Sequence, residues 1–175
     1  IIKGGVDSLY KKDKSNTGSA YEKMIPSSAP GDKRLSIVGN AAKNGEGDPR
    51  LTSILGDATK YLPEGYRAEV YSGVRPNDNR FHGQGMAQDL RLIGPDGKVI
   101  SNYQNPENFR VYEKFAQDAK KIQTEKHPEL NDAFRWGGYF SGGKGKYGAM
   151  DLMHFDTGGK RVGMGGGSWK DGLTK

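Results

Sequence analysis

The sequence has no cysteine, and this absence excludes three kinds of chemistry. Disulfide bonds, thiolate metal sites and thiol nucleophiles all depend on that side chain. Any metal site in this chain must therefore be built from histidine nitrogens and carboxylate oxygens.

Long apolar runs are missing as well. No run approaches the roughly 20 residues that a membrane-spanning helix needs, and no apolar segment of a secretory signal is visible. Hydrophobic residues make up only 33% of the chain, which is low for a globular domain, and 27 residues are glycine. We therefore expect a modest core, much irregular loop and no membrane span.

Acidic residues are outnumbered by basic ones, 21 against 27, which gives a formal net charge of +6 and a pI near 9.4. A basic surface favours polyanions such as nucleic acid, acidic lipid or the acidic polymers of a cell wall. The lysines are scattered, and no nucleic-acid recognition motif is present. A nucleic-acid partner is therefore not expected.

The length of 175 residues suits one domain with an appended arm. Residues 1–47 are polar, rich in turn-forming residues and without periodicity, which is typical of an arm or linker. A partner-binding segment is the alternative for this stretch. Residues 48–160 are predicted to form the domain, and residues 161–175 a glycine- and lysine-rich tail.

Two helices are predicted from apolar residues at helical spacing. The first covers residues 48–62, where Pro49 suits a first helical position. The second and longer helix covers residues 106–126. Its expected buried stripe contains six residues: Phe109, Tyr112, Phe115, Ala116, Ala119 and Ile122.

Alternating and aromatic stretches predict the strands. Residues 66–72, 86–93 and 98–101 are expected to form strands, the last two as a hairpin around the GPDG turn. Residues 134–140 and 151–155 are expected to add two short aromatic strands. The predicted class is α+β, a small antiparallel β-sheet with flanking helices.

The candidate chemistry lies in two stretches that are distant in sequence. His82 and Asp89 are seven residues apart, so on one regular strand they would point to opposite faces. They can converge if the chain turns between them, and the glycines Gly83 and Gly85 permit such a turn. His154 would complete three ligands of one zinc ion (Zn2+), with a fourth position left for water.

Two further residues suit hydrolysis beside such a metal. Asp151, three residues before His154, can act as a general base without being a ligand. Arg75 offers a fixed positive charge for a substrate carboxylate, a carbonyl or a developing oxyanion.

Each of these residues also has a simpler interpretation when taken alone. Either histidine can be a polar surface residue, Asp151 a cap at the start of a strand, and Arg75 a solvated loop charge. His127 is most simply a charge at a helix C-terminus and is left out of the site. From composition and spacing, a zinc hydrolase and these simpler readings both stay open.

Four motifs in a fixed order carry a family likeness: SGVRP, HGQGMAQDL, RWGGYF and DLMHF. This order resembles the zinc D-alanyl-D-alanine peptidase family, which includes VanX- and VanY-type enzymes and phage L-alanyl-D-glutamate endolysins. The family pattern is SG-x-R, S-x-H-x-x-G-x-A-x-D, W-G-G and D/E-x-x-H. The likeness covers residues 49–158 and implies the LAS fold, shared with lysostaphin-type peptidases and hedgehog domains.

The resemblance implies a role for each matched residue. His82, Asp89 and His154 would be the zinc ligands, and Asp151 the general base. Arg75 would be the arginine of the substrate or transition state. Trp136 matches the family tryptophan, which would line or support the substrate cleft; plain core packing is the alternative for it.

The sequence departs from the family pattern at three places. Arg80 stands where the family often has serine, which puts the hydrogen bonding of that loop in doubt. The base is aspartate rather than glutamate, which favours the endolysin type. The insertion SGGKGKYGA, residues 141–149, is expected to shape specificity.

The predicted function is therefore a zinc-dependent peptidoglycan peptidase that cuts an amide bond of the stem peptide, with an L-Ala-D-Glu endopeptidase favoured. The start at Ile1 and the missing signal favour a phage lytic or virion-associated domain, whose arm would contact other virion proteins. It would act on the bacterial wall from the virion or the host cytoplasm, or otherwise in the periplasm or outside the cell. The alternatives are a bacterial D,D- or L,D-carboxypeptidase of wall remodelling and a catalytically silent binding module on the same fold.

Overall fold

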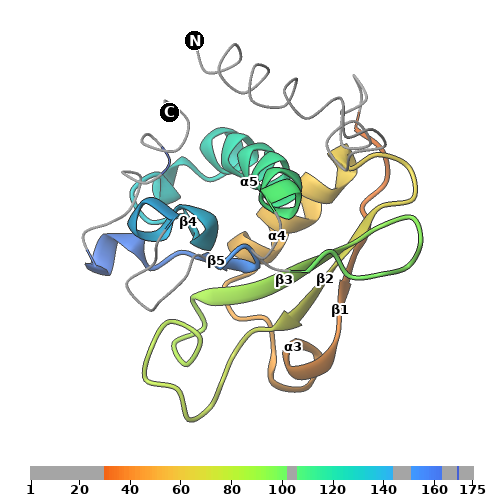
Figure 1. Cartoon of the computed structure of the whole chain (residues 1–175). Coiled ribbons are helices and arrows are strands. Elements are labelled where there is room, and N and C mark those ends of the chain that lie inside the picture. Colours follow the sequence, from red (N-terminus) through yellow and green to blue (C-terminus); the bar gives the residue numbers. More distant parts are fainter. Residues whose placement is uncertain (1–29, 102–105, 144–150, 163–168, 170–175) are drawn as a thin grey trace.

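A five-stranded sheet with helices beside it forms the centre of the fold (Figure 1). The computed structural model describes residues 30–101, 106–143, 151–162 and 169. The strand order is β1-β2-β3-β5-β4. The strands are β1 (Leu35–Ile37), β2 (Arg67–Ser72), β3 (Ala87–Ile93), β4 (Arg135–Trp136) and β5 (His154–Asp156). The predicted α+β class is confirmed.

Two helices, α4 (Pro49–Ala58) and α5 (Pro106–Lys126), lie against each other on one side of the sheet (Figure 1). The Asp48 carboxylate caps α4 by accepting a hydrogen bond from the Arg50 amide at 2.9 Å. The α5 bounds agree with the prediction, and the expected stripe is buried except for the partly buried Phe109. None of the described helices combines the length and the apolar character needed to cross a membrane.

The sheet is mixed rather than purely antiparallel, because β1 pairs with β2 in parallel. This strand and helix α3 (Gly39–Asn44) lie within residues 1–47, which were predicted to be an arm or linker. Arg34 anchors the segment: its guanidinium donates hydrogen bonds to the carbonyls of Leu62, Pro63 and Tyr66. Hydrogen bonds from one partly buried guanidinium leave no periodic pattern in the sequence, so the arm prediction does not hold for residues 35–44. Residues 1–29 lie outside the described part.

The predicted strand at residues 98–101 was also wrong, since a single bridge, Ile93 to Val99, joins it to the sheet. The Tyr112 hydroxyl accepts a hydrogen bond from the Leu92 amide at 3.0 Å and donates one to the Ile100 carbonyl at 2.7 Å. The side chain of Tyr112 thus binds the two backbone groups that would hydrogen-bond to each other if the pairing between these two segments continued.

The prediction of a strand over residues 134–140 holds only for Arg135–Trp136, because the chain then turns into a 3₁₀ helix, Gly137–Gly143. A Cβ atom on Gly137 would come within 2.2 Å of the Asp151 carbonyl. This glycine therefore permits the close approach of the segment that precedes β5.

One residue of the predicted tail, Trp169, belongs to the core. Its indole is buried, stacks on Phe134 at a centroid distance of 5.4 Å and donates a hydrogen bond to the Phe134 carbonyl at 2.6 Å. The structure describes residues 161 and 162 of this tail as the end of a 3₁₀ helix, Gly159–Val162.

Candidate metal centre

Strand register brings two of the three candidate ligands, Asp89 and His154, together. Asp89 on β3 lies directly opposite His154 on the antiparallel neighbour β5. Directly opposed residues share one face of a sheet, with Cβ atoms about 4.5–5.5 Å apart. The long separation of these two residues in sequence is thus closed by a single cross-strand pair.

The third ligand, His82, comes from the loop between β2 and β3, and this loop folds back on itself. The Arg75 amide donates a hydrogen bond to the His82 carbonyl at 3.1 Å. Gly83 is required because a Cβ atom there would lie 1.5 Å from the Asp78 carbonyl oxygen, and Gly85 has a positive φ of 73°. The predicted turn between His82 and Asp89 is confirmed, and each glycine has its own physical reason.

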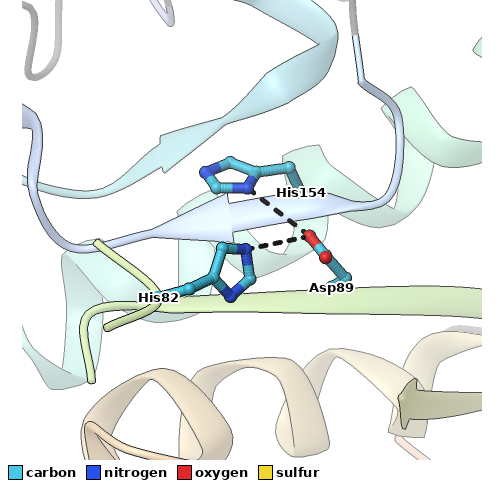
Figure 2. Close-up of side chains that lie close together, drawn as sticks. All are labelled: His82, Asp89 and His154. Carbon is cyan, nitrogen blue, oxygen red and sulfur yellow. Dashed lines mark ion pairs between the residues drawn. The ribbon is translucent and has the colours of Figure 1, made fainter. Parts of the chain in front are cut away.

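His82, Asp89 and His154 form one group whose candidate ligand atoms all lie within 4.8 Å of one another. Figure 2 shows both imidazoles turned toward the same oxygen of Asp89. Asp89 Oδ1 lies 3.4 Å from His82 Nε2 and 3.5 Å from His154 Nδ1. Zinc bonds of about 2.1 Å in a tetrahedral arrangement separate two ligand atoms by roughly 3.4 Å. The spacing therefore fits a metal ion of this size.

Hydrogen bonding at the three residues also fits a metal. Asp89 Oδ1 is buried and has no hydrogen-bond partner among the described residues, which is costly unless a cation supplies the missing interaction. The His82 Nδ1–H donates to the Gly73 carbonyl at 2.9 Å, so the lone pair of Nε2 faces the other two ligands. The donor set is two imidazoles and one carboxylate, which suits zinc.

The electrostatics of Asp89 favour its ionised form. Burial alone would raise the pKa of this carboxyl group, but the interactions with His154 and His82 outweigh it and hold the pKa well below its usual range. An ionised carboxylate is the form that binds a metal.

Behind His154 lies a second carboxylate, Asp156, which the sequence analysis missed. Asp156 Oδ2 is 2.6 Å from His154 Nε2, so this ring nitrogen donates its proton and Nδ1 stays directed at Asp89. Burial alone would lower the pKa of His154, but Asp156 and Asp89 raise it to about 10. The two carboxylates around this imidazole therefore favour a positive charge beside them, such as that of a metal ion.

Arg135 holds Asp156 from the other side. Its guanidinium donates to both carboxylate oxygens, at 2.9 and 2.7 Å, and Asp156 is fully buried. The same guanidinium lies over the rings of Phe81, at 5.2 Å, and Phe140, at 4.6 Å. Phe81 precedes His82, so one arginine contacts the surroundings of both imidazoles. One signal in the sequence could have revealed Asp156: it lies two residues after His154, which places both on one face of a strand.

Arg75 lies beside the metal group and binds one of its members. Its Nη2 donates to Asp89 Oδ2 at 2.6 Å and its Nε to Ser72 Oγ at 3.0 Å, while 41% of the side chain stays exposed. The two oxygens of Asp89 are therefore divided, one toward the histidines and one toward Arg75. Arg75 also borders an open depression of about 610 Å³ lined by Asn40, Pro76, Asn77, Asp78 and Asn79.

Asp151 lies in the turn that leads into β5 and is not a member of the 4.8 Å group. Its Oδ1 accepts a hydrogen bond from the Met153 amide at 3.2 Å, and its carbonyl accepts one from the His154 amide at 3.3 Å. The residue is partly exposed. It thus shapes the turn that carries His154.

Trp136 was predicted to line or support the substrate cleft, with plain core packing as the alternative, and its side chain lies in the core. The side chain is fully buried, so it presents no surface to a substrate. Its indole N–H donates to the Leu152 carbonyl at 2.8 Å, which fixes the turn between Asp151 and His154. Trp136 therefore supports this turn from the core, and a direct contact with the substrate is no longer expected. Residues 144–149 of the predicted specificity insertion lie outside the described part.

Comparison with protein-family models gives no match for this chain, and comparison with curated proteins gives none. Among solved structures, it is similar to the crystal structure of the Serratia marcescens L-Ala D-Glu endopeptidase ChiX, at 17% sequence identity. The alignment covers 74% of this chain and 94% of that chain, with a TM-score of 0.48. The likeness is distant, and the function proposed below is supported by the side chains described above.

Replacing Asp156 with asparagine is expected to weaken zinc binding about 10- to 100-fold, the usual effect of losing an outer partner of a ligating histidine. Four donors converge on the two oxygens of Asp156, including the Gly158 amide at 3.0 Å. An asparagine NH2 placed among them would favour the His154 tautomer with the proton on Nδ1, the nitrogen that faces Asp89.

Zinc affinity of the Asp156→Asn protein is measured by competition with a chromophoric chelator. Asp118→Asn is the matched control, because Asp118 is also ion-paired, to Lys114 at 2.8 Å, but within α5. Unchanged zinc affinity in Asp156→Asn would contradict the assigned orientation of His154.

Proposed function

We propose that this chain is a zinc-dependent peptidase that hydrolyses an amide bond in the stem peptide of bacterial peptidoglycan. The observation that carries the proposal is the convergence of His82 Nε2, Asp89 Oδ1 and His154 Nδ1 at zinc-like spacing. Three protein ligands leave a tetrahedral ion one open position, as in catalytic rather than structural zinc sites. The motif order around these residues supports a peptidase of the D-alanyl-D-alanine type.

When bound, zinc would supply Lewis acidity that polarises the scissile carbonyl and acidifies the attacking water. Asp151 takes the proton of that water and passes it to the leaving amine. Its Oδ1 is occupied by the Met153 amide, a bond that fixes the orientation of the carboxylate. The turn between Asp151 and His154 therefore carries the base and a ligand on one short segment.

Arg75 has two tasks in this proposal. Its bond to Asp89 Oδ2 holds the carboxylate so that Oδ1 faces the histidines. Its exposed part binds a carboxylate or carbonyl oxygen of the substrate, which would orient the peptide beside the three ligand residues. The open depression beside Arg75 offers space for the adjoining part of that peptide.

The substrate is proposed to be the L-Ala-D-Glu bond, and the site of action the bacterial wall. The excess of positive charge, +6, favours approach to an anionic wall. A phage lytic or virion-associated protein is the proposed source, acting from the virion or the host cytoplasm, with virion partners contacted through the N-terminal arm.

The experiment that tests this function is mass spectrometry of purified peptidoglycan fragments incubated with the protein, with and without a chelator. A new amine that appears only without the chelator and returns when zinc is added is the expected result, and the fragment masses identify the bond. Cleavage that requires a free C-terminal carboxylate would instead indicate a carboxypeptidase. Intact fragments with the zinc-loaded protein would contradict a peptidase and favour a binding module.

A further inference from the structure

A bulge interrupts β2 next to the metal group. Val70 pairs with Leu90 and Ser72 pairs with Asp89, so Tyr71 is an extra residue opposite the ligand. Bulges break the regular alternation of sides, re-aim a side chain and are frequent beside active sites. The bulge is local to this pair of strands: the four pairs from Arg67 to Val70 are regular.

The contacts of Tyr71 show where the bulge directs it. Its hydroxyl donates a hydrogen bond to the Met153 sulfur at 3.4 Å, and Met153 is the residue immediately before the ligand His154. Arg91, two residues beyond Asp89 on β3, lies over the ring with its guanidinium carbon at 5.1 Å. Tyr71 therefore spans from β2 across β3 to the turn that carries Asp151 and His154.

The hydroxyl is suited to donate to a further partner. A thioether is a weak acceptor, and this is the one hydrogen bond recorded for the Tyr71 hydroxyl within the part of the chain that the structure describes. The side chain is partly exposed. Burial and the negative charges of Asp89 and Asp151 raise the pKa of Tyr71 to about 12, so the group keeps its proton at neutral pH.

From this geometry we infer that Tyr71 is a further catalytic residue, whose hydroxyl donates a hydrogen bond to the scissile carbonyl oxygen as negative charge develops on it. The inference rests on the proposed peptidase function and adds a donor that the four sequence motifs do not include. The hydroxyl leaves the Met153 sulfur for the stronger oxygen acceptor when a peptide occupies the site. Such a donor acts on the transition state more than on the bound substrate.

The test is Tyr71→Phe, which removes the hydroxyl and keeps the ring beneath Arg91. We expect kcat on a stem-peptide substrate to fall at least about tenfold with KM little changed, since donors to a developing oxyanion act mainly on kcat. A phosphinic peptide that mimics the tetrahedral state should bind more weakly by a similar factor, and zinc affinity should stay unchanged. Tyr61→Phe is the matched control, because Tyr61 is also a partly buried tyrosine but follows α4.

The outcomes separate this inference from the proposed function. If the unmodified protein cleaves no stem peptide, the proposed function fails and the role of Tyr71 fails with it. An active protein whose Tyr71→Phe variant keeps kcat and phosphinic-peptide affinity within twofold overturns the role of Tyr71 alone. Loss of zinc from Tyr71→Phe would also overturn it, since the hydroxyl would then support the metal site and not the substrate.

Discussion

Asparagine in place of Asp89 is expected to abolish zinc binding at the proposed site, and hydrolysis with it. The charge of Asp89 Oδ1 is the one anionic ligand of the group, and it faces two imidazole nitrogens at 3.4 and 3.5 Å. Asparagine keeps the shape but offers Arg75 its carbonyl oxygen, because Arg75 donates at 2.6 Å. The amide NH2 would then face the two histidines, where a cation cannot be held. Zinc affinity should fall by more than about 100-fold, the upper end of the loss expected when a ligating histidine loses its hydrogen-bond partner.

Zinc affinity of Asp89→Asn is measured by the same chelator competition, together with zinc content after dialysis. Asp57→Asn serves as the control, since Asp57 is also held by basic side chains, Lys60 at 3.1 Å and Lys126 at 2.8 Å, but on α4. Thermal unfolding of the zinc-free proteins checks that both variants fold. Zinc affinity of Asp89→Asn within threefold of the unmodified protein would exclude Asp89 as a ligand.

The proximity of the three candidate ligands could be predicted because it follows from local rules and one pairing. The glycines around His82 indicated a turn, and the alternation of residues 86–93 placed Asp89 on a strand. The structure confirms both and adds the register that sets Asp89 opposite His154. Register depends on tertiary pairing, so the family motifs, and not spacing, supplied the partner.

The support behind the ligands was harder to predict. The last strand was expected to end at Phe155, and this boundary left Asp156 outside the analysis although it shares a face with His154. The guanidinium of Arg135 lies over the rings of Phe81 and Phe140. Phe81 lies in the loop between β2 and β3, and Phe140 lies in the 3₁₀ helix that follows β4. A cation held between rings from separate segments has no signature in a single sequence.

In the fold too, elements with a long local pattern were predicted, and elements that depend on tertiary contacts were not. The long helix Pro106–Lys126 was predicted with its bounds, because a helix leaves a periodic pattern over many residues. Residues 98–101 were predicted to form a strand but make a single bridge to the sheet. Their sequence pattern does not reveal that the Tyr112 hydroxyl binds the Leu92 amide and the Ile100 carbonyl. The edge strand Leu35–Ile37 was missed because three residues are too few for a period to show.

Asparagine at position 151 should separate base chemistry from metal binding. The expected fall in kcat is about 100- to 10,000-fold, the range for loss of a general acid or base. An amide cannot take a proton from water, but its oxygen still accepts the Met153 amide bond that Asp151 Oδ1 accepts at 3.2 Å. The turn into β5 is therefore kept, and zinc affinity should stay within threefold of the unmodified protein.

Asp96→Asn is a closely matched control for this change. Asp96 Oδ1 accepts the Lys98 amide at 2.9 Å, the same bond from residue i+2 that Asp151 makes, but in the exposed turn after β3. The two aspartates therefore share this bond from residue i+2 and differ in their location in the fold. Asp89→Asn should lose zinc and activity together, whereas Asp151→Asn should lose activity alone. If Asp151→Asn also releases zinc, the residue belongs to the metal site; if it keeps full activity, the proton acceptor is another group.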